Sequence, residues 1–144
     1  MGQRAPLMSV GEIETLFAEE FPQTEGHLVV EEVGPMRARC RTPFSDQHLR
    51  PGGTVSGPTL MRLADAAVYV AILAQIGPQS LAVTTSLNIN FLRKPAPRDV
   101  IAECRLLKLG SRLAVGEVSL FSEGEEDAPV AHATATFSIP PAKR

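Results

Sequence analysis

The chain has 144 residues, a net charge of −2 and a hydrophobic content of 44%, which suits one domain with its own core. Fourteen Lys and Arg against sixteen Asp and Glu leave no basic excess for phosphate backbones, so we expect no nucleic-acid partner. Two widely separated cysteines, Cys40 and Cys104, exclude a disulfide scaffold and a cysteine-rich zinc site.

The N-terminal segment predicts a short helix over about residues 9–21. Ser9 and Glu12 form the S-x-x-E pattern of a capping box, apolar residues follow at helical spacing, and Pro22 ends the run. Residues 1–7 lack the apolar stretch of an export signal, so we expect a cytoplasmic protein.

Residues 27–33 and 36–42 are predicted to form two strands joined by the turn Gly34-Pro35. The second strand alternates strictly, with one basic face and one face of small residues. The basic face carries Arg37, Arg39 and Arg41. Residues 43–53 show no periodicity and are rich in proline and glycine, which predicts a long irregular loop.

Residues 58–76 predict a helix that is apolar around most of its circumference, as expected of a helix enclosed by other elements. Ser56 is suited to cap the start of this helix, and Gly77-Pro78 is suited to end it. Polar residues interrupt the apolar run, so we expect no membrane span.

The rest of the chain predicts four strands, at residues 81–92, 100–109, 113–121 and 129–139. A basic crossover, residues 93–98, joins the first two of them. One long enclosed helix among antiparallel strands predicts a single α+β domain over residues 1–144, with one sheet face wrapped around the helix. Open sheet edges in so small a unit favour self-association, and we expect a homodimer or a dimer of dimers.

Three features of the sequence are candidates for chemistry. Asp65 is a carboxylate on an apolar helix, and is either functional or an exposed residue paired with Arg62. The N–H of Gly57 either binds an anion or a carbonyl oxygen, or belongs to an ordinary helix cap. A cationic cluster either binds phosphates or is solvated surface; it comprises Arg93, Lys94, Arg98, Lys108 and Arg112. The three histidines are dispersed, so we expect no metal site.

Three segments carry a pattern that is more specific than any of these features alone. They are Gly53-Thr-Val-Ser-Gly-Pro-Thr-Leu-Met-Arg-Leu-Ala-Asp65, Thr84-Thr-Ser-Leu-Asn-Ile-Asn-Phe-Leu-Arg-Lys-Pro-Ala-Pro97 and Leu107-Lys-Leu-Gly-Ser-Arg112. Together they resemble the hotdog-fold thioesterases of the PaaI-like (phenylacetic acid degradation) group, over about residues 30–139. The resemblance implies an antiparallel sheet curled around one helix and a dimer with its active sites at the subunit interface. It also implies hydrolysis of acyl-coenzyme A (acyl-CoA) without a further cofactor.

The resemblance implies roles for individual residues. Asp65 matches the catalytic carboxylate, Gly57 matches the N–H that polarises the thioester carbonyl, and Thr84 matches a hydroxyl that helps to position the water. The loops that hold CoA in the family correspond here to segments that include Arg93, Lys94, Gly110, Ser111 and Arg112. The remaining candidates for substrate binding are His48, Arg50, Ser56 and Asn90.

The chain departs from the family pattern at two positions. The family's His-Gly-Gly reads Ser56-Gly57-Pro58, and the Asn often found six residues earlier is Arg50. Arg50 has no acceptor atoms, so it either binds a carboxylate, such as that of an anionic acyl group, or pairs with Asp65. An acyl-CoA thioesterase is the preferred function. The alternatives are a non-catalytic hotdog protein that binds acyl-CoA and a related dehydratase, which would need a histidine that the Asp65 helix lacks.

Overall fold

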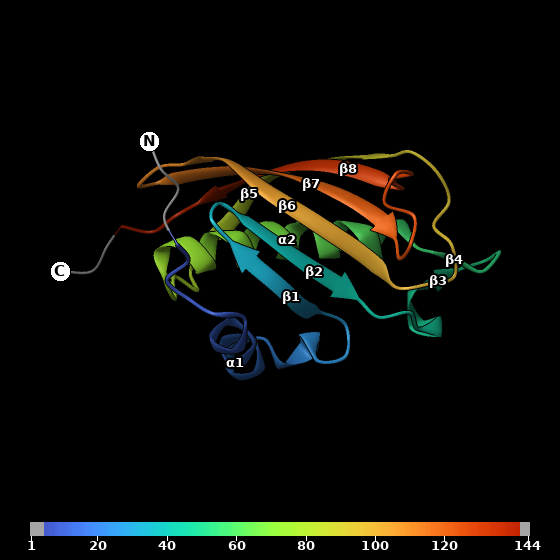
Figure 1. The fold of residues 1–144 in the computed structure, drawn as a ribbon, viewed down its shortest axis with the longest axis horizontal. Helices are drawn as coiled ribbons and strands as arrows, with labels where there is room; N and C mark the ends of the chain where they lie inside the picture. Colours follow the sequence, from blue (N-terminus) through green and yellow to red (C-terminus); the bar gives the residue numbers. More distant parts are fainter. Residues whose placement is uncertain (1–4, 142–144) are drawn as a thin grey trace.

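The computed structural model describes residues 5–141 and confirms the α+β architecture. A six-stranded antiparallel sheet, in the order β1-β2-β6-β7-β8-β5, curves around one long helix, α2 (Gly57–Ile76), and a shorter helix, α1 (Val10–Glu20), lies beside β1 (Figure 1). The strands of this sheet are β1 (Val29–Gly34), β2 (Arg37–Thr42), β5 (Val83–Phe91), β6 (Val100–Leu109), β7 (Leu113–Ser122) and β8 (Ala131–Ser138). Every predicted helix and strand is present, with ends that differ by no more than about two residues, the usual uncertainty of such boundaries.

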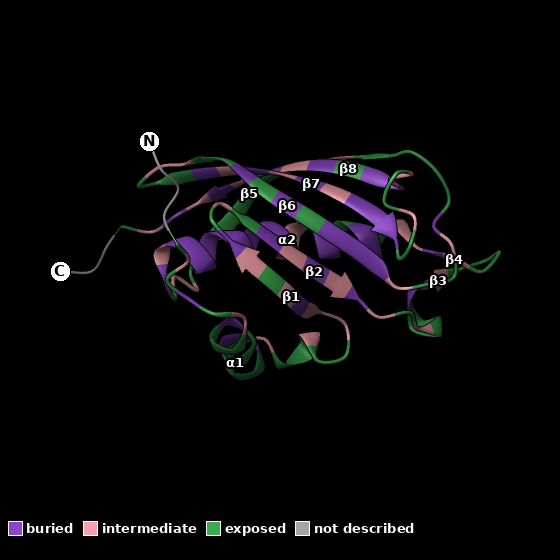
Figure 2. Cartoon of the chain, viewed as in Figure 1, coloured by how far each residue is buried: buried purple, intermediate pink, exposed green. Residues whose placement is uncertain are grey.

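α2 is the centre of the core. Ser56 caps it as predicted, since the Thr59 N–H donates to Ser56 Oγ at 3.4 Å, and Gly77, with a φ of +93°, ends it. Most of the helix is buried, which confirms the prediction of an enclosed helix (Figure 2). By length and hydropathy α2 would suffice to cross a membrane, but 72% of that window is buried inside the fold, as in any core helix.

α2 and β7 pack together at Gly116, where no side chain separates the strand from the helix. A β-carbon at this position would lie 3.2 Å from both methyl carbons of Val68 and 3.3 Å from the sulfur of Cys104. Val68 and Cys104 are themselves buried, so neither has free space to move into. The missing side chain at Gly116 therefore sets how closely the helix lies against the sheet.

The two edges of the sheet differ in how they are covered. α1 lies against the β1 edge, where its Glu14 Oε2 accepts a hydrogen bond from the Val30 N–H at 3.1 Å. β5, at the opposite edge, pairs only with β8, and none of its nine residues is fully buried. A strand of this length with one unpaired side presents a row of free backbone groups to another chain.

The face of the sheet that is turned away from α2 carries the predicted row of arginines. Arg41 forms ion pairs with Glu31, Asp99 and Glu123 at 2.6, 2.8 and 2.7 Å, and Arg39 pairs with Glu31 as well. Desolvation raises the pKa of Glu31, but the hydrogen bonds from the two arginines outweigh it and hold that pKa below its ordinary value. The arginines of this face are thus neutralised within the sheet itself.

The prediction of an irregular loop over residues 43–53 is wrong in part, because the segment contains local structure. A single 3₁₀ turn, η2 (Asp46–His48), leads into a hairpin formed by β3 (Leu49–Arg50) and β4 (Thr54–Val55). Elements of two or three residues are too short to show a periodic pattern, which is why sequence analysis did not detect them.

η2 buries His48 close to the start of α2. His48 Nε2 lies 3.1 Å from His27 Nδ1, and His48 Nδ1 lies 3.4 Å from Thr59 Oγ1. Burial lowers the pKa of His48 below its ordinary value of 6.5, and the nearby charges of His27 and Arg62 lower it further. His48 is therefore a neutral, hydrogen-bonded residue that supports the first turn of the helix.

Gly116→Ala is expected to lower the free energy of unfolding by about 1–3 kcal/mol, because the added methyl group overlaps Val68 and Cys104. In the double variant Gly116→Ala/Val68→Ala the overlap with Val68 is removed and only that with Cys104 remains, so the effects of Gly116→Ala and Val68→Ala should be less than additive. Gly11→Ala, on the exposed side of α1, is the matched control and should leave stability unchanged or raise it by up to about 1 kcal/mol. Urea denaturation measures all five proteins (wild type, Gly116→Ala, Val68→Ala, the double variant and Gly11→Ala), and strictly additive effects would contradict the close packing.

Lowering the pH should destabilise the wild-type protein more than a His48→Gln variant. Because the folded pKa of His48 lies below 6.5, the unfolded chain binds a proton that the folded chain does not, and stability is lost as the pH falls from about 7 toward that lower pKa. Urea midpoints measured between about pH 5 and pH 8 test this window. His132→Gln, which removes a half-exposed imidazole, is the control, and equal pH slopes in all three proteins would show that His48 is not the titrating group.

Candidate active site

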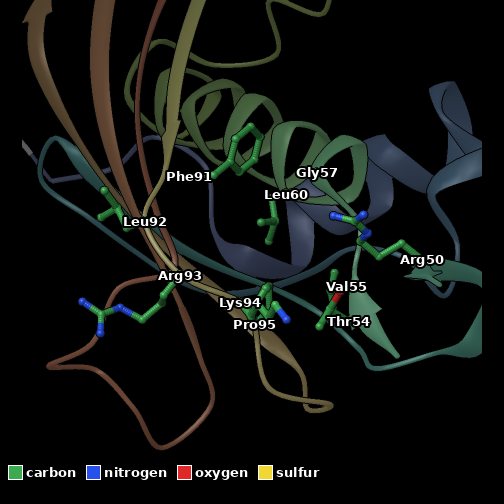
Figure 3. Close-up of a pocket in the computed structure, with 10 residues that line it drawn as sticks. All are labelled: Arg50, Thr54, Val55, Gly57, Leu60, Phe91, Leu92, Arg93, Lys94 and Pro95. Atoms are coloured by element: carbon green, nitrogen blue, oxygen red, sulfur yellow. The ribbon is translucent and has the colours of Figure 1, made fainter. Parts of the chain in front are cut away.

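A cavity of about 490 Å³ opens at the start of α2, between the β3–β4 hairpin, the end of β5 and the segment that follows β5 (Figure 3). Its apolar walls are formed by Val55, Leu60, Phe91, Leu92 and Pro95. Its polar lining consists of Arg50, Thr54, Gly57, Arg93 and Lys94. This combination suits a ligand that has both an apolar portion and anionic groups.

Gly57 contributes a free backbone N–H to this cavity. It is the first residue of α2, so no carbonyl one turn earlier accepts from this N–H, and no other acceptor for it occurs among residues 5–141. The ring of Phe91 lies against Gly57, since an added β-carbon would be 3.4 Å from Phe91 Cζ. An N–H at a helix start beside a cavity is a donor for an anion or for a polarised carbonyl oxygen.

The charged side chains of the cavity are all cationic. In the part of the chain that the structure describes, no carboxylate pairs with Arg50, Arg93 or Lys94, and no Asp or Glu lines the cavity. Arg93 Nε donates to the Pro129 carbonyl at 3.0 Å, and its side chain extends away from the other lining residues (Figure 3). The guanidinium of Arg50 is instead directed toward the start of α2. The positive end of the α2 dipole adds to this field.

Asp65 is half-buried on α2, and its Oδ1 accepts a hydrogen bond from Thr84 Oγ1 at 2.5 Å. The alternative in which Asp65 pairs with Arg62 is not observed among the described residues. A β-bulge between Thr84 and Ser86 brings Thr84 to the inner face of the sheet, opposite buried Phe137. Strict alternation would have turned Thr84 outward with Ser86, away from the carboxylate.

The cavity and the Asp65–Thr84 pair are separate within one protomer. Asp65 follows Gly57 by eight residues, which places it about 12 Å farther along the helix axis. Neither Asp65 nor Thr84 lines the cavity. The chain thus carries two separate polar features on the same helix, one with a free N–H and nearby cations and one with a carboxylate.

The turn 110–112 lies far from the cavity in the same protomer. It connects β6 and β7 at the end of the sheet where β5 begins, next to Val83. The cavity is at the Phe91 end, about 26 Å away along the nine-residue strand. One protomer therefore does not bring Gly110, Ser111 and Arg112 together with Arg93 and Lys94.

Three further candidates do not line the cavity. Ser56 is the N-cap of α2, and its Oγ lies 2.9 Å from Thr59 Oγ1. His48 is buried and does not line the cavity. Asn90 is in register with His132 on the outer face of the sheet, away from α2. No group of His, Cys, Asp or Glu side chains suited to a metal ion occurs within residues 5–141.

Sequence analysis did not single out Phe91 or Leu60, although both line the cavity. The alternation of β5 contains the signal for Phe91, because it places this ring on the inner face with Leu87 and Ile89. Leu60 carries no such signal, since it is one of many apolar residues on α2.

Residues 52–129 match the family model of the thioesterase superfamily. A solved structure from Silicibacter sp., provisionally named a thioesterase, is 44% identical and covers 98% of this chain and 97% of that chain, with a TM-score of 0.89. The phenylacetic acid degradation protein PaaI of Thermus thermophilus, solved as a mutant, is 30% identical over 83% of this chain and 99% of that chain, with a TM-score of 0.71. A provisionally named esterase of Halobacterium salinarum is 29% identical over 102 residues, which are 67% of this chain and 66% of that protein.

The family match covers more than half of the chain and includes α2 and β5, the elements that carry Gly57, Asp65 and Thr84. The curved sheet around one central helix agrees with the solved relatives over nearly the whole chain. This protein belongs to the thioesterase superfamily and has its hotdog fold.

Proposed function

We propose that the protein hydrolyses an acyl-CoA thioester to a free acid and CoA. One observation carries this proposal: in a member of the thioesterase superfamily, a single buried helix holds a free N–H at Gly57 and a hydrogen-bonded carboxylate at Asp65. The first group is suited to bind a carbonyl oxygen, and the second is suited to activate water.

Asp65 acts as the general base. As a water oxygen attacks the thioester carbon, the carboxylate takes one proton of the water, and the carbonyl oxygen becomes an oxyanion. The Gly57 N–H and the positive end of the α2 dipole stabilise this oxyanion. Collapse of the tetrahedral intermediate breaks the C–S bond, and the proton held by Asp65 passes to the leaving thiolate. The Thr84 hydroxyl holds Oδ1 and leaves Oδ2 free for the water.

This mechanism requires a homodimer, because Gly57 and Asp65 of one chain are about 12 Å apart along the helix, whereas catalytic groups act within about 3 Å of the reacting atoms. β5 offers the surface for a second copy, with nine residues and one unpaired side. Antiparallel pairing of two β5 strands about a two-fold axis near Leu87 would set the Phe91 end of one copy beside the Thr84 end of the other. The cavity of each subunit would then meet the carboxylate of its partner.

The same pairing accounts for the scattered cations. It would bring the turn 110–112 of one subunit toward Arg93 and Lys94 of the other, since these segments lie at opposite ends of β5. Cations from both subunits would then surround the phosphates of CoA. No CoA site is complete in one chain on this arrangement.

A second candidate function is binding of acyl-CoA without hydrolysis. Arg50 and Ser56 favour it, because they stand where the family pattern has Asn and His. Calorimetry that detects tight CoA-ester binding by a protein without turnover would support this candidate over the first.

Asp65→Asn should lower kcat for acyl-CoA esters by about 10²–10⁴-fold, because the amide keeps the shape of the side chain but accepts no proton from water. The released thiol is assayed over a panel of short aliphatic, aromatic and carboxylated acyl groups. Both cysteines of the protein are buried, so they add little background to a thiol reagent. Equal rates for the wild type and Asp65→Asn on every ester would contradict the assignment of the base.

Gly57→Pro should lower kcat by about 10²–10³-fold, because proline removes the N–H while fitting the first helical position. Gly57→Ala is the matched control, since it also adds a β-carbon 3.4 Å from Phe91 Cζ but keeps the N–H. Equal losses of kcat in both variants would show that the added atoms, and not the missing Gly57 N–H, cause the effect.

Mixing the two inactive variants tests the shared site. If each site takes Gly57 from one subunit and Asp65 from the other, co-refolded Gly57→Pro and Asp65→Asn chains form heterodimers with one intact site, restoring about one quarter of the wild-type activity. No recovery in a mixture shown to contain heterodimers would place both groups in one chain.

A further inference from the structure

We propose that Arg50 selects acyl groups that carry their own carboxylate, so that the preferred substrates are thioesters of short dicarboxylic acids. This inference rests on the proposed thioesterase function, because it concerns the acyl group held beside Gly57. It is carried by the position, the direction and the unpaired charge of the Arg50 side chain.

The hairpin holds the Arg50 backbone in one place beside the cavity. Arg50 and Thr54 are paired across β3 and β4, and the Gly53 N–H donates to the Arg50 carbonyl at 3.1 Å. Pro51 and Gly52 occupy the middle of this turn, and Gly52 has a φ of +98°, the combination that a type II turn requires. The long side chain is thus attached to a defined turn, and its guanidinium points toward the start of α2 (Figure 3).

Arg50 has no carboxylate partner among residues 5–141, and it shares this with Arg62, Arg93 and Arg112, three of the nine arginines in that range. Five other arginines form ion pairs: Arg37, Arg39, Arg41, Arg98 and Arg105. An acyl chain that fills the cavity displaces water from the Arg50 guanidinium. A neutral chain leaves that desolvation uncompensated, whereas a carboxylate replaces the water with two parallel charge-assisted hydrogen bonds.

The directions of the cations separate the two ends of the substrate. The Arg93 side chain extends away from the start of α2, and its Nε donates a hydrogen bond to the Pro129 carbonyl. This position suits contact with the CoA end of the substrate. Arg50 lies at the helix start, where the thioester carbonyl is held by Gly57 in the proposed mechanism. A carboxylate that meets Arg50 is therefore only a few bonds from that carbonyl, and Leu60 offers an apolar contact for the methylenes between them.

Two substrates of equal length test the proposal: glutaryl-CoA, with a terminal carboxylate, and valeryl-CoA, with a methyl group in its place. Wild type should prefer glutaryl-CoA, and Arg50→Gln should lower kcat/KM for glutaryl-CoA by about tenfold to a hundredfold while leaving valeryl-CoA nearly unchanged. Arg50→Lys keeps the positive charge but cannot form two parallel hydrogen bonds to a carboxylate. Its kcat/KM for glutaryl-CoA should therefore lie between those of the wild type and Arg50→Gln. Arg105→Gln, on the outer face, removes one charge without touching the cavity and should change neither substrate.

Two results would overturn the proposal. If Arg50→Gln weakens both CoA esters equally and the loss vanishes with pantetheine thioesters, which lack the nucleotide phosphates, Arg50 binds those phosphates. If it weakens both esters equally and shifts the acidic limb of the pH profile, Arg50 pairs with the partner's Asp65. A loss confined to the glutaryl esters, and retained on pantetheine, supports recognition of the acyl carboxylate.

The proposal remains testable if the protein hydrolyses no ester. Calorimetry would then compare the affinities of glutaryl-CoA and valeryl-CoA for wild type and Arg50→Gln. A preference for glutaryl-CoA that disappears in Arg50→Gln supports the role of Arg50 even though the thioesterase function has failed. Equal affinities in the wild type would overturn the role of Arg50.

Discussion

The enclosure of α2 by the sheet is the constraint on which the rest of the structure depends. A helix that is apolar around most of its circumference has no polar face to leave in water, so the sheet must curve around it, and at Gly116 the strand meets the helix without an intervening side chain. The same enclosure fixes two polar groups of the helix, the N–H of Gly57 at its start and the carboxylate of Asp65, about 12 Å apart. Because neither can move toward the other, a reaction that needs both has to draw on two helices. On the proposed mechanism, the packing of the core therefore also requires two subunits.

Periodicity was sufficient to predict most of the fold. The enclosed helix and the outward row of arginines on β2 follow from patterns of at least six residues, and the cap at Ser56 follows from the local Ser56-Gly57-Pro58 sequence. Two features that shape the candidate site do not follow from such patterns. The β3–β4 hairpin consists of two-residue strands, and the β-bulge between Thr84 and Ser86 reverses the face on which Thr84 lies. The pairing of the strands in both features depends on backbone hydrogen bonds with partners that are defined only once the chain has folded. Pro51-Gly52 indicates a turn, but it does not predict the two-residue strands on either side.

Family resemblance and structure contribute different knowledge of the site. The resemblance grouped Asp65, Gly57 and Thr84 by their positions in the sequence motifs of the family. It gave no distances between these residues. The structure joins Asp65 to Thr84 by a hydrogen bond and separates both from the cavity at Gly57. Asn90 and His48 belong to neither group. Asn90 faces outward on β5, and His48 is buried near the start of α2. Side-chain direction, which a linear motif does not record, decides these outcomes.

The positions of the charged residues say more about ligand binding than the net charge of the chain does. A net charge of −2 describes a nearly neutral chain, yet the cations differ in how they are compensated. On the outer face, Arg39 and Arg41 are paired with carboxylates on neighbouring strands or directly beside them, so that face presents little free positive charge to a ligand. At the cavity, Arg50 and Lys94 have no carboxylate partner among the described residues, and the start of α2 adds its own partial positive charge. The arginines of the outer face are thus paired within the fold, whereas Arg50 and Arg93 at the cavity are not, which leaves positive charge at the cavity for an anion.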